Sequence, residues 1–167
     1  MMSAWEQSSG ATDEWYTPAY IFSALAERFD LDVAAPEQGP LHVPTERWFH
    51  TNALAQPWFG FVWMNPPFGG RNGLVPWLDR FFEHANGIAL TPDRTSAPWF
   101  RNAAPRASAI LFVPKVKFIR PDGTIGKQPG TGTALWASGP RATAALMRAC
   151  KPLDGVLMVP ISRRTID

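Results

Sequence analysis

Four consecutive residues, Asn65-Pro66-Pro67-Phe68, combine side chains and backbone groups that could hold an amine. They follow the apolar run 60–64, which has the length and composition of a strand buried on both faces. Neither proline has an N–H, and each keeps the residue before it extended, so the backbone leaves this strand rigid. The Pro66 carbonyl and the side-chain oxygen of Asn65 then form two fixed acceptors, which suit one –NH2 group.

An amine held in this way becomes a better nucleophile. With both N–H bonds engaged, the nitrogen lone pair turns out of conjugation and toward an electrophile, while the ring of Phe68 offers a face on which a planar base stacks. The pattern therefore favours alkylation of an exocyclic amine. The alternative interpretation of the same residues is an ordinary exit from a strand into a loop.

Three blocks of sequence carry a resemblance to a known family. Asn65-Pro66-Pro67-Phe68 resembles the Asp/Asn/Ser-Pro-Pro-Tyr/Phe motif of S-adenosylmethionine-dependent amino methyltransferases, a motif that glutamine and guanine N-methyltransferases share. The blocks 14–18, 29–35 and 63–68, in this order, are similar to the phage-type (Dam-like) DNA N6-adenine methyltransferases, and the resemblance spans about residues 13 to 138. It implies a Rossmann-like methyltransferase fold with an antiparallel last strand near the edge of the sheet. It also implies S-adenosylmethionine as cofactor and an intracellular, cytoplasmic protein of phage or prophage origin.

The resemblance also implies cofactor-binding residues. Asp32, near the end of a short strand, is expected to accept from the ammonium group of the cofactor's methionine portion, and small residues beside it allow close backbone approach. A turn or helix cap is the alternative role for Asp32. Where many methyltransferases carry a Gly-rich loop, this chain has residues 34–39, Ala-Ala-Pro-Glu-Gln-Gly. The full set of expected cofactor contacts is Trp15, Thr17, Pro18, Asp32, Ala34, Ala35 and Asn65.

A basic cluster follows in the second half of the chain. Residues 115–120 alternate basic with apolar side chains, and residues 121–132 are so rich in turn formers that a long mobile loop is expected. Beside an amine-methylating pocket such charges suit a phosphate backbone, although a solvated hairpin explains them equally well. The expected nucleic-acid contacts are Arg71, in the glycine-rich loop 69–73, and Lys115, Lys117, Arg120 and Lys127.

Composition limits the class of protein. The 167 residues are 46% hydrophobic and 18% charged, which excludes general disorder and indicates one globular domain. A single cysteine, Cys150, excludes an internal disulfide and fits a reducing compartment. His42, His50 and His84 lack metal-ligand spacing and are interpreted as ordinary surface or loop residues, so no metal is expected. Neither a membrane span nor an export signal is indicated, and a formal charge of +2 permits a nucleic-acid partner.

Alternation of helical spacing with apolar runs predicts an α/β fold with a mostly parallel sheet and helices on both faces. Thr17 is expected to cap a first helix that begins at Pro18, and Thr95 or Ser96 to cap a short later helix. Phe22, Phe29, Phe81 and Phe112 are expected in the core. Strands are expected at 30–35, 60–64, 87–91, 109–113, 133–137 and 155–159, with further helices near 74–85 and 141–149. Residues 1–13 are expected to form a flexible arm, 14–160 the methyltransferase domain and 161–167 a tail.

The function expected from these observations is methyl transfer from S-adenosylmethionine to N6 of an adenine in DNA, with Asn65, Pro66, Pro67 and Phe68 as the catalytic block. The adenine must be flipped out or already single-stranded. A chain of this length indicates a short or relaxed target sequence, and it carries no signal of oligomeric state. Two alternatives remain open: the same chemistry on RNA or a protein glutamine, and a catalytically silent nucleic-acid-binding module.

Overall fold

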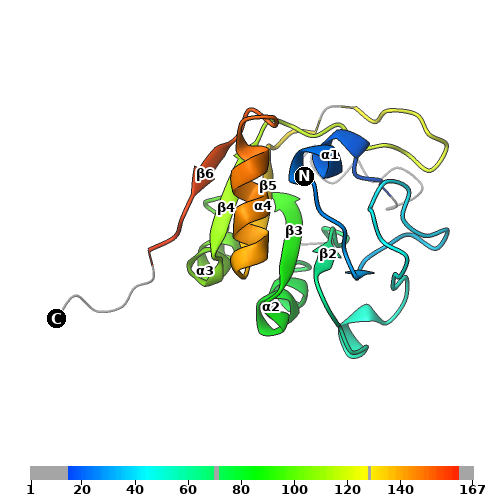
Figure 1. Ribbon diagram of the computed structural model, residues 1–167, viewed down its shortest axis with the longest axis horizontal. Helices are drawn as coiled ribbons and strands as arrows, with labels where there is room; N and C mark the ends of the chain where they lie inside the picture. Colours follow the sequence, from blue (N-terminus) through cyan, green and yellow to red (C-terminus); the bar gives the residue numbers. More distant parts are fainter. Residues whose placement is uncertain (1–14, 70–71, 128, 162–167) are drawn as a thin grey trace, which may run out of the picture.

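The computed structural model describes residues 15–69, 72–127 and 129–161 of the chain (Figure 1). The predicted N-terminal arm and most of the predicted C-terminal tail therefore lie outside the described residues. Helices and strands alternate through the described part, in the order α1 (Ala19–Leu25), β1 (Leu31–Asp32), the 3-10 helix η2 (Ala53–Ala55), β2 (Val62–Met64), α2 (Val75–His84), β3 (Gly87–Pro92), α3 (Pro98–Ala103), the 3-10 helix η3 (Ala104–Arg106), β4 (Ala109–Val113), β5 (Thr133–Ser138), α4 (Pro140–Cys150) and β6 (Val156–Met158).

The elements lie where apolar spacing predicted them, but the expected helix caps are wrong. Pro18 itself is the N-cap of α1, without a side-chain hydrogen bond, and the hydroxyl of Thr17 is bonded elsewhere. Ala97, rather than Thr95 or Ser96, is the N-cap of α3. Each helix has a proline with a fixed φ at its N-terminus, Pro18 as the N-cap of α1 and Pro98 as the first residue of α3. The N-cap residues Pro18 and Ala97 are extended, and neither helix start has a side-chain cap.

The six strands form one mixed sheet in the order β1-β2-β3-β5-β4-β6. β1, β2 and β3 pair in parallel, whereas β5 pairs antiparallel with both β3 and β4, and β6 pairs antiparallel with β4. The prediction of a mostly parallel sheet is therefore wrong. The described residues of the connection from β4 to β5 contain a turn of antiparallel pairing at Ile119 and Ile125 and no crossover helix, and β5 returns antiparallel between β3 and β4.

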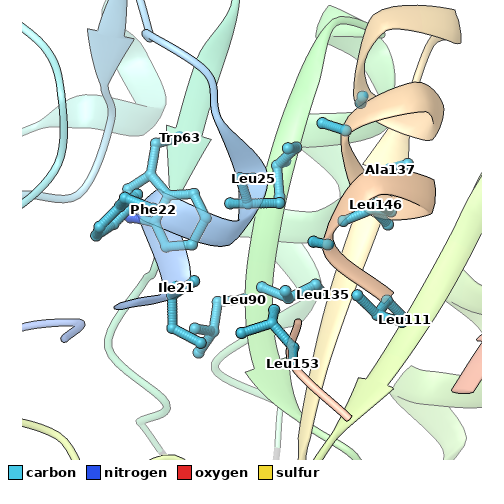
Figure 2. Close-up of a cluster of buried hydrophobic side chains, with 14 of the residues drawn as sticks. Ile21, Phe22, Leu25, Trp63, Leu90, Leu111, Leu135, Ala137, Leu146 and Leu153 are labelled. Atoms are coloured by element: carbon cyan, nitrogen blue, oxygen red, sulfur yellow. The ribbon is translucent and has the colours of Figure 1, made fainter. Parts of the chain in front are cut away.

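Helices cover both faces of this sheet, as predicted. On one face α1 and α4 pack against the strands through a core that includes Ile21, Leu25 and Leu146 (Figure 2). On the other face α2 and α3 contribute Phe81 and Phe100. Three of the four predicted core phenylalanines are fully buried, and Phe112 is partly buried against the second core. The helices on both faces therefore fix the strands whose carboxyl ends carry the candidate site.

Candidate active site

The predicted site residues follow two neighbouring parallel strands. Leu31 and Asp32 of β1 pair in parallel with Val62 and Trp63 of β2. The segments that follow the two strands therefore leave from the same end of the sheet. After β1 the chain runs outward to Trp48, which bridges Asp32 in parallel on the side away from β2, and then returns to form β2. The strand order therefore reverses at β1. In open α/β sheets such a reversal creates a crevice at the carboxyl ends of the strands, where ligands bind.

Asn65 is the first residue after β2, and its side chain is anchored. The Nδ2 atom of Asn65 donates a hydrogen bond of 3.1 Å to Oγ1 of Thr17, and Thr17 is only 5% exposed. Pro66 is buried behind this corner, while Pro67 is exposed. An amide that donates from its nitrogen presents its oxygen on the opposite side. The corner thus keeps one side-chain acceptor for a ligand.

Asp32 is a buried carboxyl group at the end of β1. It is 4% exposed, and its Oδ1 atom accepts a hydrogen bond of 3.0 Å from the backbone N–H of Ala34. Burial raises the pKa of Asp32 from an ordinary 3.8 to about 7, and the Ala34 hydrogen bond lowers it only in part. A buried carboxylate of this kind is stabilised by an incoming cation.

Asp30 lies two residues earlier and has a different role. Its Oδ2 atom accepts a hydrogen bond of 2.7 Å from the backbone N–H of Phe61, which fixes the start of β2. A Cβ atom on Gly60, whose φ is +63°, would lie 2.3 Å from that carboxylate oxygen. Asp30 therefore has a structural role, whereas Asp32 lines the pocket.

A narrow pocket joins Asp32 to Asn65. Five of the seven predicted cofactor contacts line it: Trp15, Thr17, Asp32, Ala34 and Asn65. The two others, Pro18 and Ala35, are buried but do not line the pocket: Pro18 is the N-cap of α1, and the backbone N–H of Ala35 donates to the Phe49 carbonyl. The cavity volume is about 20 Å³. A larger hollow of about 400 Å³ lies on α3 and η3, lined by Pro98, Arg101, Asn102 and Pro105, and contains none of the predicted residues.

Several pocket residues were not predicted as site residues. Most come from an irregular segment after β1, in which no periodicity marks one side chain as different from the next. His42, interpreted from sequence as an ordinary loop residue, lines the pocket and is half-buried. The additional lining residues are Tyr16, Pro36, Pro40, Leu41, His42, Val43 and Trp63.

The basic segment is tied to the pocket by backbone pairing. The backbone of Tyr16 and that of Ile119 exchange hydrogen bonds of 2.8 and 2.9 Å, and Ile119 also bridges Ile125. Residues 119–125 therefore form a hairpin, where a long mobile loop was expected. In Figure 1 this yellow segment between β4 and β5 extends past α1. The pairing of Tyr16 with Ile119 therefore joins the predicted basic cluster to the wall of the pocket.

Within that cluster the basic side chains differ. The guanidinium of Arg120 lies 5.6 Å from the ring centroid of Trp15 and donates to Oγ1 of Thr124 at 3.2 Å, so it braces the hairpin against the pocket. Lys115, Lys117 and Lys127 are exposed. Arg71 lies outside the described residues. Phe68, which follows the proline corner, is 39% exposed and is not among the residues that line the pocket.

Among the described residues, no group of three or more His, Cys, Asp or Glu side chains is arranged to hold a metal ion. Among the same residues, no helix has the length and apolar character needed to cross a membrane.

The fold and site define a class: an α/β protein with a ligand pocket at the carboxyl ends of adjacent parallel strands. The family model described as DNA N-6-adenine-methyltransferase (Dam) matches residues 6–135. The chain therefore belongs to the Dam family of DNA N-6-adenine methyltransferases, as the resemblance implied.

Comparison with solved structures gives a more distant likeness. The chain is similar to protein LPL1258 of Legionella pneumophila, with 12% sequence identity and a TM-score of 0.39. The match covers 74% of this chain and 54% of the other, so this chain spans about half the length of that protein. No curated protein matches the sequence.

Proposed function

We propose that this chain transfers a methyl group from S-adenosylmethionine to the exocyclic N6 of adenine in DNA, on a Rossmann-like methyltransferase fold. The observation that carries the proposal is the shared pocket: a proline-locked amide and a buried carboxylate lie at the ends of two adjacent strands. Family membership supports adenine N6 as the acceptor. When bound, the cofactor supplies a methyl group on a sulfonium, which is already a good leaving group.

The lining of the pocket fits the chemistry of this cofactor. Asp32 provides a buried carboxylate for an ammonium group, and Ala34 lets the backbone approach closely. Trp15 and Val43 provide apolar wall for an adenosine moiety. A cavity of about 20 Å³ is far below the roughly 300 Å³ or more that such a ligand occupies. Binding therefore requires the wall formed by residues 36–43 to move outward.

Asn65 and Pro66 act on the acceptor. The Oδ1 atom of Asn65 and the Pro66 carbonyl accept hydrogen bonds from the two amine hydrogens, which directs the nitrogen lone pair toward the donor. As the nitrogen becomes cationic during transfer, both hydrogen bonds strengthen. Neither acceptor can retain a proton, so the proton leaves to water. Phe68 stacks on the base and keeps it in the plane that this geometry needs.

The surface favours a nucleic acid as acceptor, and family membership supports DNA. Exposed Lys115, Lys117 and Lys127 lie on or next to a hairpin that is paired to the pocket wall at Tyr16. A base inside a duplex cannot reach the pocket, so the adenine is flipped out or single-stranded.

A catalytically silent nucleic-acid-binding module is the second candidate, and the small cavity volume favours it. Calorimetry with S-adenosylmethionine separates the two functions, because only the enzyme requires binding. Methyl counting with labelled S-adenosylmethionine on DNA, RNA and protein then tests the acceptor. Incorporation into DNA supports the proposal; incorporation confined to RNA or protein changes the acceptor, and cofactor binding below detection supports the silent module.

A further inference from the structure

Trp15 lines the pocket and also packs against the basic hairpin. The guanidinium of Arg120, on one arm of the hairpin, lies over the Trp15 ring at 5.6 Å from its centroid. Gly126, directly after the other arm, donates its N–H to the Phe118 carbonyl at 2.8 Å. A Cβ atom on Gly126 would lie 2.5 Å from Cζ3 of the Trp15 ring. Both sides of the hairpin therefore hold one aromatic side chain of the pocket.

The hydrogen bonds of Arg120 within the hairpin fix its guanidinium group. Its Nη1 atom donates to Oγ1 of Thr124 and to the Ile125 carbonyl, each at 3.2 Å. The Thr124 hydroxyl donates its own hydrogen to Oδ1 of Asp122 at 2.6 Å, so its oxygen accepts from Arg120. The Thr124 hydrogen bonds, and to a lesser degree the nearby Arg120 charge, lower the pKa of Asp122 and keep it an acceptor.

A phosphate contact would require a different position of this side chain. Arg120 is half-buried, whereas the lysines of the predicted cluster are exposed. To meet a phosphate in solvent, the guanidinium would have to leave the Trp15 ring and its two acceptors in the hairpin. Arg120 was expected from sequence to bind nucleic acid, but its contacts point toward the pocket.

We propose that Arg120 is a positioning residue that holds Trp15 in the cofactor pocket, rather than a phosphate contact. This inference rests on the proposed binding of S-adenosylmethionine. A cation within about 6 Å of the centroid of an indole ring is attracted to the face of the ring. Arg120 acts through Trp15, so it affects the affinity of the cofactor and not the salt dependence of DNA binding.

Arg120→Gln removes the cation and keeps a polar side chain. The dissociation constant of S-adenosylmethionine, measured by calorimetry, is expected to rise about 2- to 5-fold, the effect of one lost cation–π contact. Arg47→Gln is the matched control, because the Arg47 guanidinium lies 5.4 Å from the ring centroid of Phe59 and neither residue lines the pocket. This control removes the same charge and is expected to change the dissociation constant less than about twofold.

DNA titrations at several salt concentrations measure the second property. Arg120→Gln is expected to leave the dependence of the logarithm of affinity on the logarithm of salt concentration unchanged, whereas Lys117→Gln reduces this slope by about 1. An Arg120 that contacts phosphate would give the reverse result, a slope reduced by about 1 with the cofactor affinity of the parent chain.

Two further variants test whether Arg120 acts through Trp15. Trp15→Leu keeps an apolar wall without a π face, and in this background Arg120→Gln is expected to change cofactor affinity less than about twofold. Thr124→Val removes one hydrogen bond of the hairpin and leaves Arg120 over the ring, so cofactor affinity is expected to stay that of the parent chain. An Arg120 that only stabilises the hairpin would make the losses from Thr124→Val and Arg120→Gln equal.

Each outcome decides the inference. Weaker cofactor binding in Arg120→Gln that disappears in the Trp15→Leu background, with the salt slope unchanged, supports it. Unchanged cofactor affinity, a salt slope reduced by about 1, the same loss without Trp15, or an equal loss in Thr124→Val overturns it and leaves the proposed methyltransferase intact. If Trp15→Leu binds too weakly for calorimetry, the salt slope and Thr124→Val decide alone. A parent chain that does not bind S-adenosylmethionine overturns the proposed function and this inference together.

Discussion

The side-chain amide of Asn65 donates to the hydroxyl of Thr17 over 3.1 Å, across 48 residues of sequence. Through this bond the segment that leads into α1 meets the corner that ends β2. The same segment carries Trp15, on which Arg120 stacks from the basic hairpin. Three consecutive residues, 15–17, thus connect the candidate cofactor pocket, the proline corner and the candidate DNA surface.

Asp32 is expected to make folding stability depend on pH. Its pKa is raised to about 7 in the folded chain, so the folded chain holds a proton that the unfolded chain has released above an ordinary pKa of 3.8. Stability therefore falls as pH rises from about 4 to 7. Asp32→Asn removes this slope, and its stability relative to the parent is expected to grow by about 2 to 3 kcal/mol between pH 5 and pH 8. Urea denaturation at both pH values measures it, and a constant difference would contradict it.

Cofactor affinity is expected to show the opposite trend. The ammonium group binds the ionised form of Asp32, so a protonated carboxyl must first lose its proton. Affinity for S-adenosylmethionine is expected to rise as pH increases toward 7, by up to about tenfold per pH unit. Calorimetry from pH 5.5 to pH 7.5 checks this. Asp32→Asn should bind weakly with a flat profile; a steep profile in that variant would assign the titration to another group.

Phe68 is expected to contribute to binding of the acceptor base. Loss of a stacked ring costs about 1 to 3 kcal/mol per base, so Phe68→Ala should raise KM for DNA about 5- to 150-fold, while Phe68→Tyr keeps the stack. Phe59→Ala is a matched control, because Phe59 is 37% exposed but precedes β2 rather than following it. Steady-state kinetics on one oligonucleotide measures both variants. Equal effects of the two alanine substitutions would remove Phe68 from the site.

The exposed lysines of the basic segment are expected to act through phosphate. Substitution of Lys115, Lys117 or Lys127 by Gln should weaken DNA binding for all sequences alike and reduce the salt dependence of the logarithm of affinity by about 1 per residue. Lys151→Gln, an exposed lysine at the end of α4, is the control. Titrations at several salt concentrations measure the slope. A loss confined to one DNA sequence would indicate base contacts instead.

Local chemistry made the β2 strand and its exit predictable. The apolar run before Asn65 and the two prolines after it define a strand and a rigid exit without reference to the rest of the fold, and Asp32 lies at the end of the short first strand. The partner of Asn65 was not predictable, because a threonine 48 residues away had an equally good local role as a helix cap. His42 carried no local signal either, since its segment has no periodic pattern.

Strand direction was the principal error in the predicted fold. Residues 109–113 and 133–137 read as buried strands in sequence, and apolar composition does not reveal direction. The connection from β4 to β5 contains the hairpin at 119–125. After it, β5 enters the sheet between β3 and β4 and pairs antiparallel with both. The sequence also does not distinguish the roles of Asp30 and Asp32. Asp30 accepts a hydrogen bond from the Phe61 N–H, and Asp32 lines the pocket.

The proline-locked corner is tested most directly by the identity of the methylated nucleoside. The chain is incubated with labelled S-adenosylmethionine and DNA, the DNA is digested to nucleosides, and the labelled species is identified, with Asn65→Ala in parallel. We expect N6-methyldeoxyadenosine from the parent chain and a signal reduced about 100-fold or more in Asn65→Ala. A label on another nucleoside, or the same signal from Asn65→Ala, would contradict it.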